Sequence, residues 1–388
     1  MRLFVLFIFI YSQALSKSET IFSAVSLDSI VKKSLLDSNK KTDHFGEANA
    51  DSSIILIRSK LNQLNISSPM NFTFNDPVVD RIQKYLGKER GLISRMIGIS
   101  EYYFPLIEKH LDRFQLPLEL KYLAVLESSL NPVARSRSGA VGLWQFMYPT
   151  AKEYGLNITS YLDERQDPLK STIAACEYFE FLYKMFQDWD LVLAAYNAGP
   201  GYISRLMIKT EYDNYWDLRD KLSKETQWYI PKFIAISYVM TYYKDYNIEK
   251  RSYNFSRNDV DTISFKEQAP YYLISDYFCT NDETIAYLNP TYKTKILPRN
   301  RLITLPNNII TDATLNKNYF YEYLSKVYQK VILVNETMIS YIVVKGDNLS
   351  KIAKYYDLNV SEIKKWNNLN SDFLSIGQKL ILYVRNEE

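Results

Sequence analysis

Residues 116–147 read LPLELKYLAVLESSLNPVARSRSGAVGLWQFM and place the acidic side chain of Glu127 at the end of an apolar segment. Leucine, tyrosine, alanine and valine occupy nearly every face of residues 118–126, which is typical of a buried helix. The pair Asn131-Pro132 predicts the end of that helix, because a residue that precedes proline disfavours the helical conformation. A glycine-containing loop follows.

The position of Glu127 predicts a carboxyl group with a raised pKa. Burial disfavours the charged form, and the negative partial charge at a helix C-terminus acts in the same direction. A carboxyl group whose pKa is raised in this way can serve as a general acid near neutral pH. The helix alone leaves a second interpretation open, in which Glu127 is an ordinary helix-end residue that faces solvent.

Three motifs extend the pattern along the chain. They are ES-x-x-NP-x-x-x-S…GLWQFM from 127 to 147, AYNAGPG at 195–201, and ET-x-x-YIPK at 225–232. Together they resemble the lytic transglycosylase domain of the goose-lysozyme-like superfamily. The segment DERQDP at 163–168 is similar to the branch called membrane-bound lytic murein transglycosylase D, although its Asp-Pro pair also predicts a capped helix start.

The resemblance implies a peptidoglycan-cleaving enzyme that works with one carboxyl group. Glu127 would protonate the glycosidic oxygen between N-acetylmuramic acid and N-acetylglucosamine, and would then accept the proton of the muramic C6 hydroxyl as a 1,6-anhydro ring closes. No metal and no cofactor are implied. The residues implied to bind the glycan strand are Ser136, Gln145, Phe146, Met147, Tyr196, Asn197, Glu225 and Tyr229.

Two other functions remain open at this point. A water-using muramidase of the same fold would need a second carboxylate, and the candidates are Asp163, Glu164 and Glu177. An inactive peptidoglycan-binding scaffold is the alternative from another class of protein. The presence of Glu127 together with Gln145 argues against it.

The C-terminal segment 340–385 predicts the order strand, helix, helix, strand. Its sequence YIVVKGDNLSKIAKYYDLNVSEIKKWNNLNSDFLSIGQKLILYV, from 341 to 384, resembles a LysM module, which binds polymers that contain N-acetylglucosamine. The resemblance implies glycan contacts from Gly346, Asp347, Asn348 and Leu349. Asn348 stands where that family commonly has threonine or serine.

Residues 258–307 are similar in sequence to parts of the C-terminal module. Residues 283–290 parallel 361–368, and 301–305 parallel 379–383, so we predict a second, degenerate LysM-like unit. The unit lacks the Gly-Asp turn, which makes glycan binding there doubtful, and a lone hairpin is the alternative structure.

The remaining domain boundaries follow from changes in composition along the chain. Residues 1–16 combine Arg2, an apolar run and a small-x-small site, which predicts a secretory signal peptide. Because no cysteine follows the run, we expect an exported protein of the periplasm or cell envelope, without a lipid anchor and without a membrane span in the mature chain. We expect a flexible lead at 17–75 with a short helix over 54–64, a helical catalytic domain at 76–247, and a linker at 308–338.

Composition limits the other function classes. The net charge of +3 gives no indication of nucleic-acid binding. The two cysteines and two histidines form no pattern typical of a metal or nucleophile site, and Cys176 in IAACEYF predicts a small core residue. The 33 tyrosines fit either core filling or sugar-binding walls. The predicted fold class is α+β and multidomain: a mainly α-helical, lysozyme-like domain followed by small βααβ LysM modules.

Overall fold

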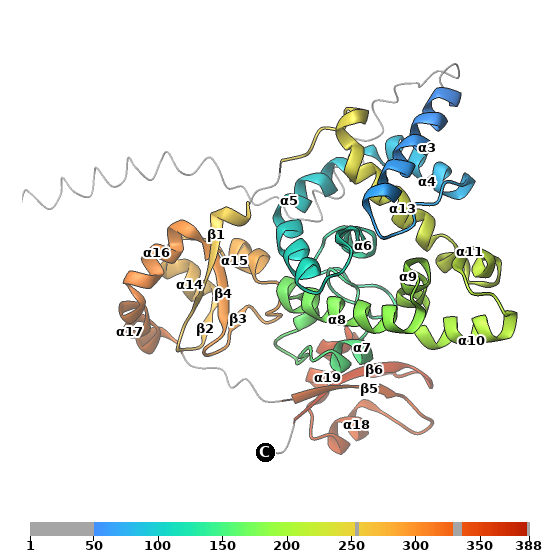
Figure 1. Cartoon of the computed structure of the whole chain (residues 1–388). Helices are drawn as coiled ribbons and strands as arrows, with labels where there is room; N and C mark the ends of the chain where they lie inside the picture. The colour runs from blue at the N-terminus through green and yellow to red at the C-terminus, as the bar shows by residue number, and fades with distance from the viewer. Residues whose placement is uncertain (1–49, 253–255, 329–335, 386–388) are drawn as a thin grey trace, which may run out of the picture. The chain divides into compact units, whose positions relative to one another are not determined.

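Helix α13, Tyr229–Tyr242, is the central helix of the helical region. Its sequence YIPKFIAISYVMTY is apolar on all sides, and eleven of its side chains are buried, as expected for a helix surrounded by other elements. It packs against α3, α4, α5, α6 and α9 (Figure 1). The computed structural model describes residues 50–252, 256–328 and 336–385, so the predicted signal peptide lies outside the described residues.

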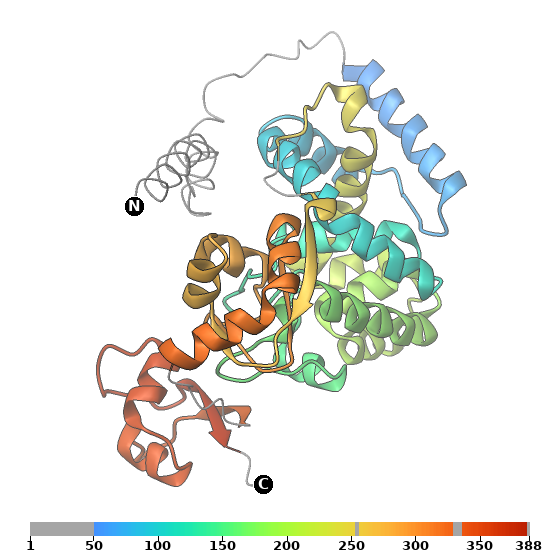
Figure 2. The same ribbon diagram turned by 90° about the vertical axis from the view of Figure 1, so that its left-hand side faces the viewer.

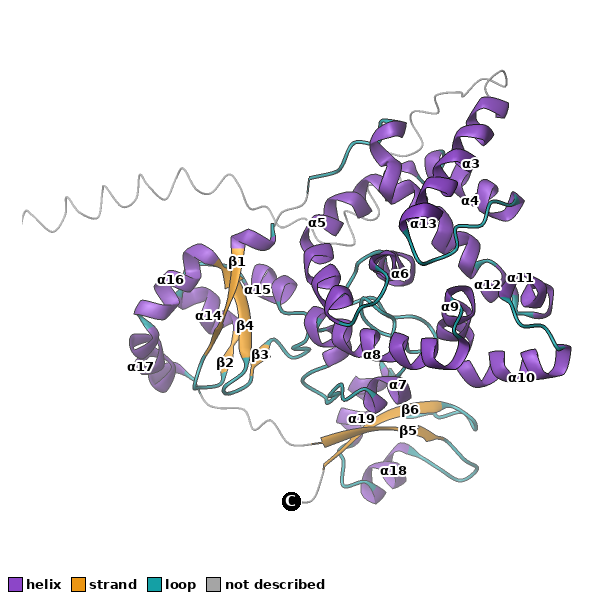
Figure 3. Ribbon diagram, viewed as in Figure 1, coloured by secondary structure: helices purple, strands orange, loops and turns teal. Residues whose placement is uncertain are grey.

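The described elements before residue 250 are helices, and every described strand begins at or after Val260 (Figure 3). The helices are α3 (Ala50–Ser67), α4 (Asp76–Leu86), α5 (Arg90–Arg113), α6 (Lys121–Ser128), α7 (Tyr148–Glu153), α8 (Pro168–Phe186), α9 (Trp189–Ala198), α10 (Pro200–Thr210), α11 (Tyr215–Leu218), α12 (Lys224–Gln227) and α13. Within the described ranges, none of the helices is both long enough and apolar enough to cross a membrane.

The predicted flexible lead is wrong for residues 50–75. Helix α3 extends beyond the predicted 54–64 and packs against α13, with Ile57, Leu61 and Leu64 buried. The segment after it buries Met70 and Phe72. The apolar side chains are sparse in sequence but recur at helical spacing, so they cover α13 although the segment as a whole is polar.

The helix that carries Glu127 ends earlier than predicted. Helix α6 stops at Ser128, before the Asn131-Pro132 pair, because Ser129 and Leu130 both adopt left-handed conformations with φ of 54° and 59°. The amide of Ser129 donates to the Val125 carbonyl at 2.8 Å, which closes the last turn. Leu130 is thereby buried, so core packing rather than proline ends the helix.

Two βααβ units follow the helical region. In the first, β1 (Val260–Ser264) pairs antiparallel with β4 (Leu302–Pro306) around α14 (Tyr271–Tyr277) and α15 (Asp282–Leu288). In the second, β5 (Glu336–Ile342) pairs antiparallel with β6 (Lys379–Arg385) around α18 (Leu349–Tyr355) and α19 (Val360–Asn367), coloured red in Figure 2. The first unit is therefore no lone hairpin. It also contains a short pair, β2 (Ala269–Pro270) with β3 (Ile296–Leu297).

One asparagine occupies the same place in both units. The Asn289 amide nitrogen donates to the carbonyls of Ile285 and Thr304, and its oxygen accepts from the Thr304 amide at 2.7 Å. Asn367 makes the same three bonds, to Ile363 and Ile381. Each asparagine thus ties the end of the second helix to the last strand, where it satisfies backbone groups of both.

These bonds correct the predicted alignment of the last strands by one residue. Thr304 corresponds to Ile381, not to Leu382, so Ile303 corresponds to Leu380. Burial agrees, since Ile303 and Leu380 are fully buried whereas Leu302 is exposed. A shift of one residue in a strand exchanges its two faces, and similarity between aliphatic side chains alone did not reveal it.

The predicted linker at 308–338 is also wrong over most of its length. Residues 307–327 form α16 (Asn307–Leu315) and α17 (Lys317–Val327), and α16 packs on β1 and β4. Phe320 and Leu324 of α17 are buried with Phe265 in the core of the first unit. The strand β5 then begins at Glu336, ahead of the predicted boundary at 340.

Candidate active site

Glu127 lies in the last turn of α6, facing the start of α13. The Tyr229 hydroxyl donates a hydrogen bond to Glu127 Oε1, and Tyr229 is the first residue of α13. Since α13 is fixed by burial on all sides, its first residue holds the carboxyl group from a rigid element. The carboxyl group therefore has a defined orientation, and the solvent-facing alternative for Glu127 is not supported.

The environment raises the pKa of Glu127 from its ordinary value to about 7. Burial is the largest cause, and the negative charge of Glu225 adds to it. The Tyr229 hydrogen bond and the positive charge of Lys232 act in the opposite direction, because both stabilise the carboxylate. The predicted raised pKa is confirmed, and at neutral pH Glu127 is present in both its acid and its carboxylate form.

The second carboxylate that acts on Glu127 is Glu225. Glu225 was not among the residues that the sequence offered as a second carboxylate. Asp163 instead forms a buried ion pair with Arg165, and Glu164 pairs with Lys170. Glu177 is exposed on α8. Glu225 itself is exposed and lies in α12, two residues after the capping residue Ser223.

The loop at 139–146 is anchored to the helix that carries the acid. Ser128 Oγ, next to Glu127, donates to the Leu143 carbonyl at 2.9 Å. Gly142 has φ of +93°, and a Cβ atom there would lie 1.8 Å from the Arg165 carbonyl oxygen. Only glycine fits this position, since both the left-handed φ and the close backbone approach exclude a side chain.

The DERQDP segment supports this loop from the other side. The buried Arg165 guanidinium donates to both oxygens of Asp163, at 2.9 and 2.8 Å, and to the carbonyls of Gly139 and Phe146. Asp167 accepts from the amides of Leu169 and Lys170 at the start of α8. The structural interpretation of this motif as a capped helix start is confirmed, and the arginine adds a role that the sequence did not reveal.

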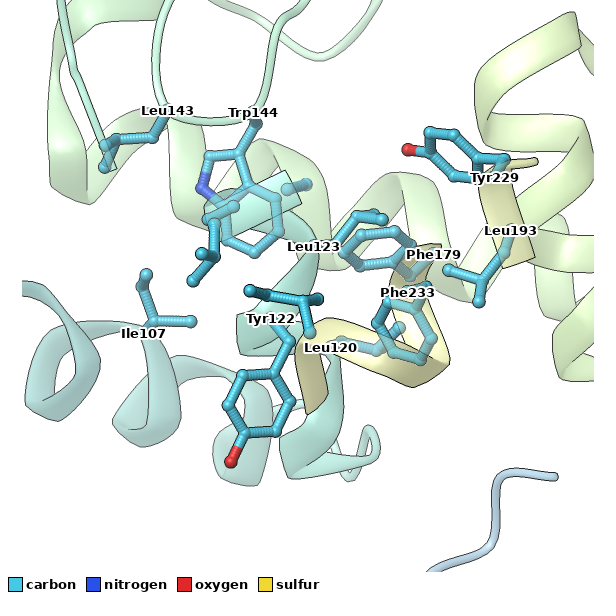
Figure 4. Close-up of a cluster of buried hydrophobic side chains, with 14 of the residues drawn as sticks. Ile107, Leu120, Tyr122, Leu123, Leu143, Trp144, Phe179, Leu193, Tyr229 and Phe233 are labelled. Carbon is cyan, nitrogen blue, oxygen red and sulfur yellow. The ribbon is translucent and has the colours of Figure 1, made fainter. Parts of the chain in front are cut away.

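Tyr196 connects the second motif to the same loop. Its hydroxyl donates to the Trp144 carbonyl at 2.6 Å, and its ring stacks on Phe179. Trp144 is fully buried, donates from Nε1 to Thr172 Oγ1 at 3.0 Å, and packs against Phe179 (Figure 4). The Trp144 side chain is therefore part of the core. Tyr229, rather than Tyr196, is the residue bonded to the acid.

Asn197 joins the second motif to the third. Its Oδ1 accepts a hydrogen bond of 2.8 Å from Thr226 Oγ1, which lies between Glu225 and Tyr229 in the sequence. The C-terminal end of α9 and the short helix α12 are therefore tied together beside α13. The three motifs thus meet at Glu127 although they are spread over a hundred residues.

Two residues that were predicted to bind substrate hold the loop's own backbone. Ser136 Oγ accepts from the Ala140 amide at 2.9 Å, and Gln145 Nε2 donates to the carbonyls of Ala134 and Gly142. Gln145 adopts a left-handed φ of 50°. Phe146 is buried, whereas Met147 is 39% exposed. Of the last two, Met147 is the side chain with access to a ligand.

In the C-terminal module, Gly346, Asp347 and Asn348 lie in the turn before α18, and Leu349 is the first residue of that helix. Asp347 Oδ2 accepts from the Tyr341 hydroxyl and the Val344 amide, and Asn348 Oδ1 accepts from the Lys351 amide as the helix cap. Gly346 has φ of +96°, and Leu349 is buried. These contacts define the shape of the turn, and Leu349 belongs to the core of the module.

Three residues with functional contacts were not singled out from the sequence: Ser128, Arg165 and Lys232. Ser128 and Lys232 lie inside the first and third motifs, which was the available signal. Cys176, predicted to be a core residue, is fully buried. Among the residues that the structure describes, no group of three or more histidine, cysteine, aspartate and glutamate side chains is placed to hold a metal ion.

Comparison with known protein families assigns two segments. Residues 105–217 match the transglycosylase SLT domain, and residues 341–382 match the LysM domain. The chain therefore contains an SLT domain followed by a LysM domain. The first match includes the acid at the end of α6 and the second motif, and it ends before α12.

Several curated proteins are similar to the chain. Membrane-bound lytic murein transglycosylase D of Escherichia coli K12 is 28% identical over 323 residues, which are 81% of this chain and 70% of that protein. Membrane-bound lytic murein transglycosylase F of Vibrio cholerae is 30% identical over 136 residues, 32% of this chain and 24% of that protein. An autolysin of Enterococcus faecalis is 43% identical over 42 residues, 11% of this chain and 6% of that protein.

Solved structures give weaker similarity. The 70 kDa soluble lytic transglycosylase of Escherichia coli aligns over 37% of this chain and 24% of its own, with 24% identity and a TM-score of 0.32. A lytic transglycosylase of Pseudomonas aeruginosa aligns over 53% and 45%, with 16% identity and a TM-score of 0.34.

Proposed function

We propose that this chain is a lytic transglycosylase that cleaves the β-1,4 bond between N-acetylmuramic acid and N-acetylglucosamine in peptidoglycan and leaves 1,6-anhydro ends. The observation that carries the proposal is the Glu127 carboxyl group, whose pKa is raised to about 7 and which Tyr229 holds at the end of α6. The SLT and LysM matches and the similarity to murein transglycosylases support the same activity.

The reaction needs one group that first gives and then takes a proton. Protonated Glu127 donates its proton to the glycosidic oxygen as the bond from that oxygen to the muramic C1 breaks. The muramic C6 oxygen then bonds to C1, and the C6 hydroxyl proton passes to the Glu127 carboxylate. Glu127 is thereby returned to its acid form. General acid–base help of this kind accelerates a reaction by about two to four powers of ten.

The surroundings of Glu127 suit both halves of this cycle. A pKa near the working pH makes a group effective as acid and as base in turn. Burial and Glu225 favour the acid, whereas Tyr229 and Lys232 favour the carboxylate. The loop at 139–146 lies beside the acid through Ser128. We assign substrate contacts to Met147 of the adjoining segment and to Glu225, which are exposed.

The chemical form of the released glycan ends tests the proposal. Purified sacculi digested with the chain should release muropeptides with 1,6-anhydro-muramic ends, which are lighter by one water than the reducing ends that a hydrolase makes. Mass spectrometry of the released fragments measures the ratio of the two. A product mixture dominated by reducing ends would overturn the proposal.

One observation favours a second candidate, a water-using muramidase. Glu225 is a second carboxylate whose charge acts on Glu127, and a hydrolase of the inverting type needs a base that activates water. The variant Glu225→Gln separates the two functions. A transglycosylase keeps producing anhydro ends without Glu225, whereas a muramidase that uses Glu225 as base loses its reducing-end product.

We assign wall targeting to the C-terminal LysM domain. Holding an enzyme on an insoluble polymer raises the effective concentration of glycan at its site. A chain that ends at Tyr328 should bind sacculi more weakly in a pull-down assay but should still turn over short soluble glycans; equal loss of both would contradict this role. With such a substrate, the protein acts outside the cytoplasm, as the apolar N-terminal run also indicates.

A further inference from the structure

Thr226 carries a buried hydroxyl group that the proposed reaction does not use. The residue lies in α12 and is 2% exposed. Its Oγ1 donates to Asn197 Oδ1 at 2.8 Å and lies 3.0 Å from Ser223 Oγ. A hydroxyl group has one hydrogen to donate, so the bond to Asn197 leaves Thr226 Oγ1 to accept from Ser223. The three side chains thus form a chain of hydrogen bonds that ends at the Asn197 amide.

The bond from Thr226 fixes which end of the Asn197 amide faces outward. An asparagine side chain carries an accepting oxygen and a donating NH₂ group, and a half-turn about its last torsion exchanges the two. Since Thr226 holds Oδ1, Nδ2 points the other way. Within the part of the chain that the structure describes, Nδ2 has no hydrogen-bond partner, and it is not among the unpaired atoms that are sealed from solvent. Asn197 therefore offers a donor to a ligand.

This pair of side chains lies beside the acid. Asn197 directly follows Tyr196, and the pKa of the Tyr196 hydroxyl is raised by burial and, less strongly, by the charge of Glu127. Thr226 directly follows Glu225, whose charge helps to raise the pKa of Glu127. Each member of the pair is thus next in sequence to a residue that interacts electrostatically with the acid, and such interactions weaken with distance.

The backbone around Thr226 has supports other than the Thr226 hydroxyl group. The Tyr215 hydroxyl donates to the carbonyls of Thr226 and Gln227, at 3.0 and 2.8 Å. Arg219 Nε donates to the Gln227 carbonyl at 2.9 Å. Because these bonds hold α12 in place, the specific effect of the Thr226 hydroxyl group is on the orientation of the Asn197 amide.

We propose that Thr226 is a positioning residue for the reaction, which turns the NH₂ group of Asn197 toward the glycan strand. The inference rests on the proposed function, because it takes the ligand at Glu127 to be a strand of N-acetylhexosamine units. Such units present carbonyl and hydroxyl oxygens that accept from an NH₂ group. Thr226 is buried and touches no substrate. It acts by disfavouring the opposite orientation of the amide, in which Asn197 Oδ1 would face those oxygens.

The test measures initial rates of cleavage of soluble glycan strands by variants of the full chain. Thr226→Val removes the hydroxyl group at nearly constant volume. It should raise KM about two- to tenfold, the loss of one hydrogen bond, while kcat stays within about twofold, because a contact made equally in the ground and transition states affects KM alone. Thr226→Ser keeps the hydroxyl group and should keep the wild-type KM.

A matched control removes another buried threonine hydroxyl from the helical region. Thr159 is buried, and its Oγ1 accepts from the Leu162 amide at 3.2 Å. Thr159→Val should therefore leave KM unchanged. If Thr226→Val and Thr159→Val have the same KM, the proposal is overturned. Should Thr226→Val fail to fold, Thr226→Ser and Thr226→Ala differ only by the hydroxyl group and carry the same comparison.

A double-mutant cycle tests whether Thr226 acts through Asn197. Asn197→Ala removes the donor and should raise KM at least as much as Thr226→Val does. Adding Thr226→Val to Asn197→Ala should then change KM by less than about twofold, because the hydroxyl group has no amide left to hold. Changes in KM that multiply in the double variant would show that the two residues act independently, and would overturn the proposal.

The pH dependence separates positioning of the amide from displacement of α12. If Glu225 stays in place, the alkaline limb of activity in Thr226→Val coincides with that of the wild type, which is the expected result. Displacement of α12 would move Glu225 and shift the limb with the pKa of Glu127. A shifted limb with an unchanged KM overturns the proposal.

The type of glycan end is measured on the same digests. If the wild type makes anhydro ends but Thr226→Val behaves like the control, the role of Thr226 is refuted and the proposed reaction stands. If the wild type makes reducing ends, the proposed reaction is refuted, whereas the KM values still decide the role of Thr226. A chain that cleaves no glycan refutes both.

Discussion

Glu127 meets its hydrogen-bond partner Tyr229 across 102 residues of chain, whereas Asn367 of the C-terminal module bonds to residues four and fourteen positions away. The acid site is assembled from three distant motifs around a buried helix. Each βααβ unit is assembled within about fifty residues around one asparagine. The difference implies that single changes at the acid site alter chemistry, whereas single changes in the units alter local stability.

The largest effect is expected from removal of the acid. Glu127→Gln should lower the rate of release of anhydro ends by about two to four powers of ten, because an amide can neither give nor take the proton. Below about pH 4.5, where the wild-type carboxyl group is protonated in both the folded and the unfolded state, thermal unfolding should change little. Glu119→Gln, a change in the same apolar stretch but outside the site, is the control. If the Glu127 variant kept wild-type turnover, Glu127 would not be the catalytic acid, and the acid site would not differ from the βααβ units in the way stated above.

The next effect tests the contact between the loop and its support. Gly142→Ala should lower the free energy of unfolding by about 2–4 kcal/mol, since the new methyl group adds overlap with the Arg165 carbonyl to the strain of a positive φ. Gly139→Ala is the matched control, because Gly139 has a similar φ of +91° but no atom within 4 Å of the added Cβ.

Urea-induced unfolding of the two glycine variants measures the difference. The control should lose only about 1 kcal/mol, the cost of the left-handed conformation for an L residue. Equal losses in the two variants would show that the backbone approach of Arg165 has no energetic consequence, and the loop would then be held by its hydrogen bonds alone.

A smaller and more local effect is expected in the units. Asn289→Ala and Asn367→Ala each leave backbone groups without their partner, at about 1–3 kcal/mol. Amide exchange should rise in β1 and β4 for the first variant and in β5 and β6 for the second. If either variant changed exchange in the helical region as strongly as in its own unit, the local character of the βααβ units would be disproved.

The smallest effect is a pair of opposite shifts in pH dependence. Activity of the acid form should fall as pH rises through about 7, because Glu127 then loses its proton. Tyr229→Phe removes a bond that favours the carboxylate, so the pKa and the alkaline limb should move up. Glu225→Gln removes a negative charge, so they should move down. Each shift should be at most about one pH unit.

Initial rates on soluble glycan strands between pH 5 and 9 measure the position of the alkaline limb in the wild type and in both variants. Glu180→Gln, an acidic residue of α8, controls for the general loss of one negative charge. Shifts of the same sign in the Tyr229 and Glu225 variants would show that neither group acts on Glu127 as the structure indicates.

Much of the architecture follows from the sequence because its signals are local. The apolar run before Glu127 predicted the raised pKa, and the strand–helix–helix–strand order of 340–385 is the observed one. The helices α16 and α17 were missed because Phe320 and Leu324 are buried by a core formed elsewhere in the chain. The effect of Glu225 on the pKa of Glu127 was missed because the resemblance implied a contact between Glu225 and the glycan strand, not an influence on the acid.

The one-residue error in the last strand of the first unit has the same origin. Leu302 and Ile303 are similar in hydrophobicity, and only the bonds of Asn289 determine which of them faces the core. The assignments of Ser136 and Gln145 as glycan contacts stay predictions. The structure uses their side chains to hold the loop, which a motif comparison cannot distinguish from a role in binding.

The raised pKa of Glu127 also couples folding to proton uptake. The unfolded chain releases this proton near pH 4.5, whereas the native protein keeps it up to about pH 7. Across that window the native state binds more protons than the unfolded state, so stability falls as pH rises and stays reduced above it. The carboxyl group proposed to act in catalysis therefore lowers the free energy of unfolding in alkaline solution. The Glu127→Gln variant, which has no such group to ionise, should resist denaturation there better than the wild type.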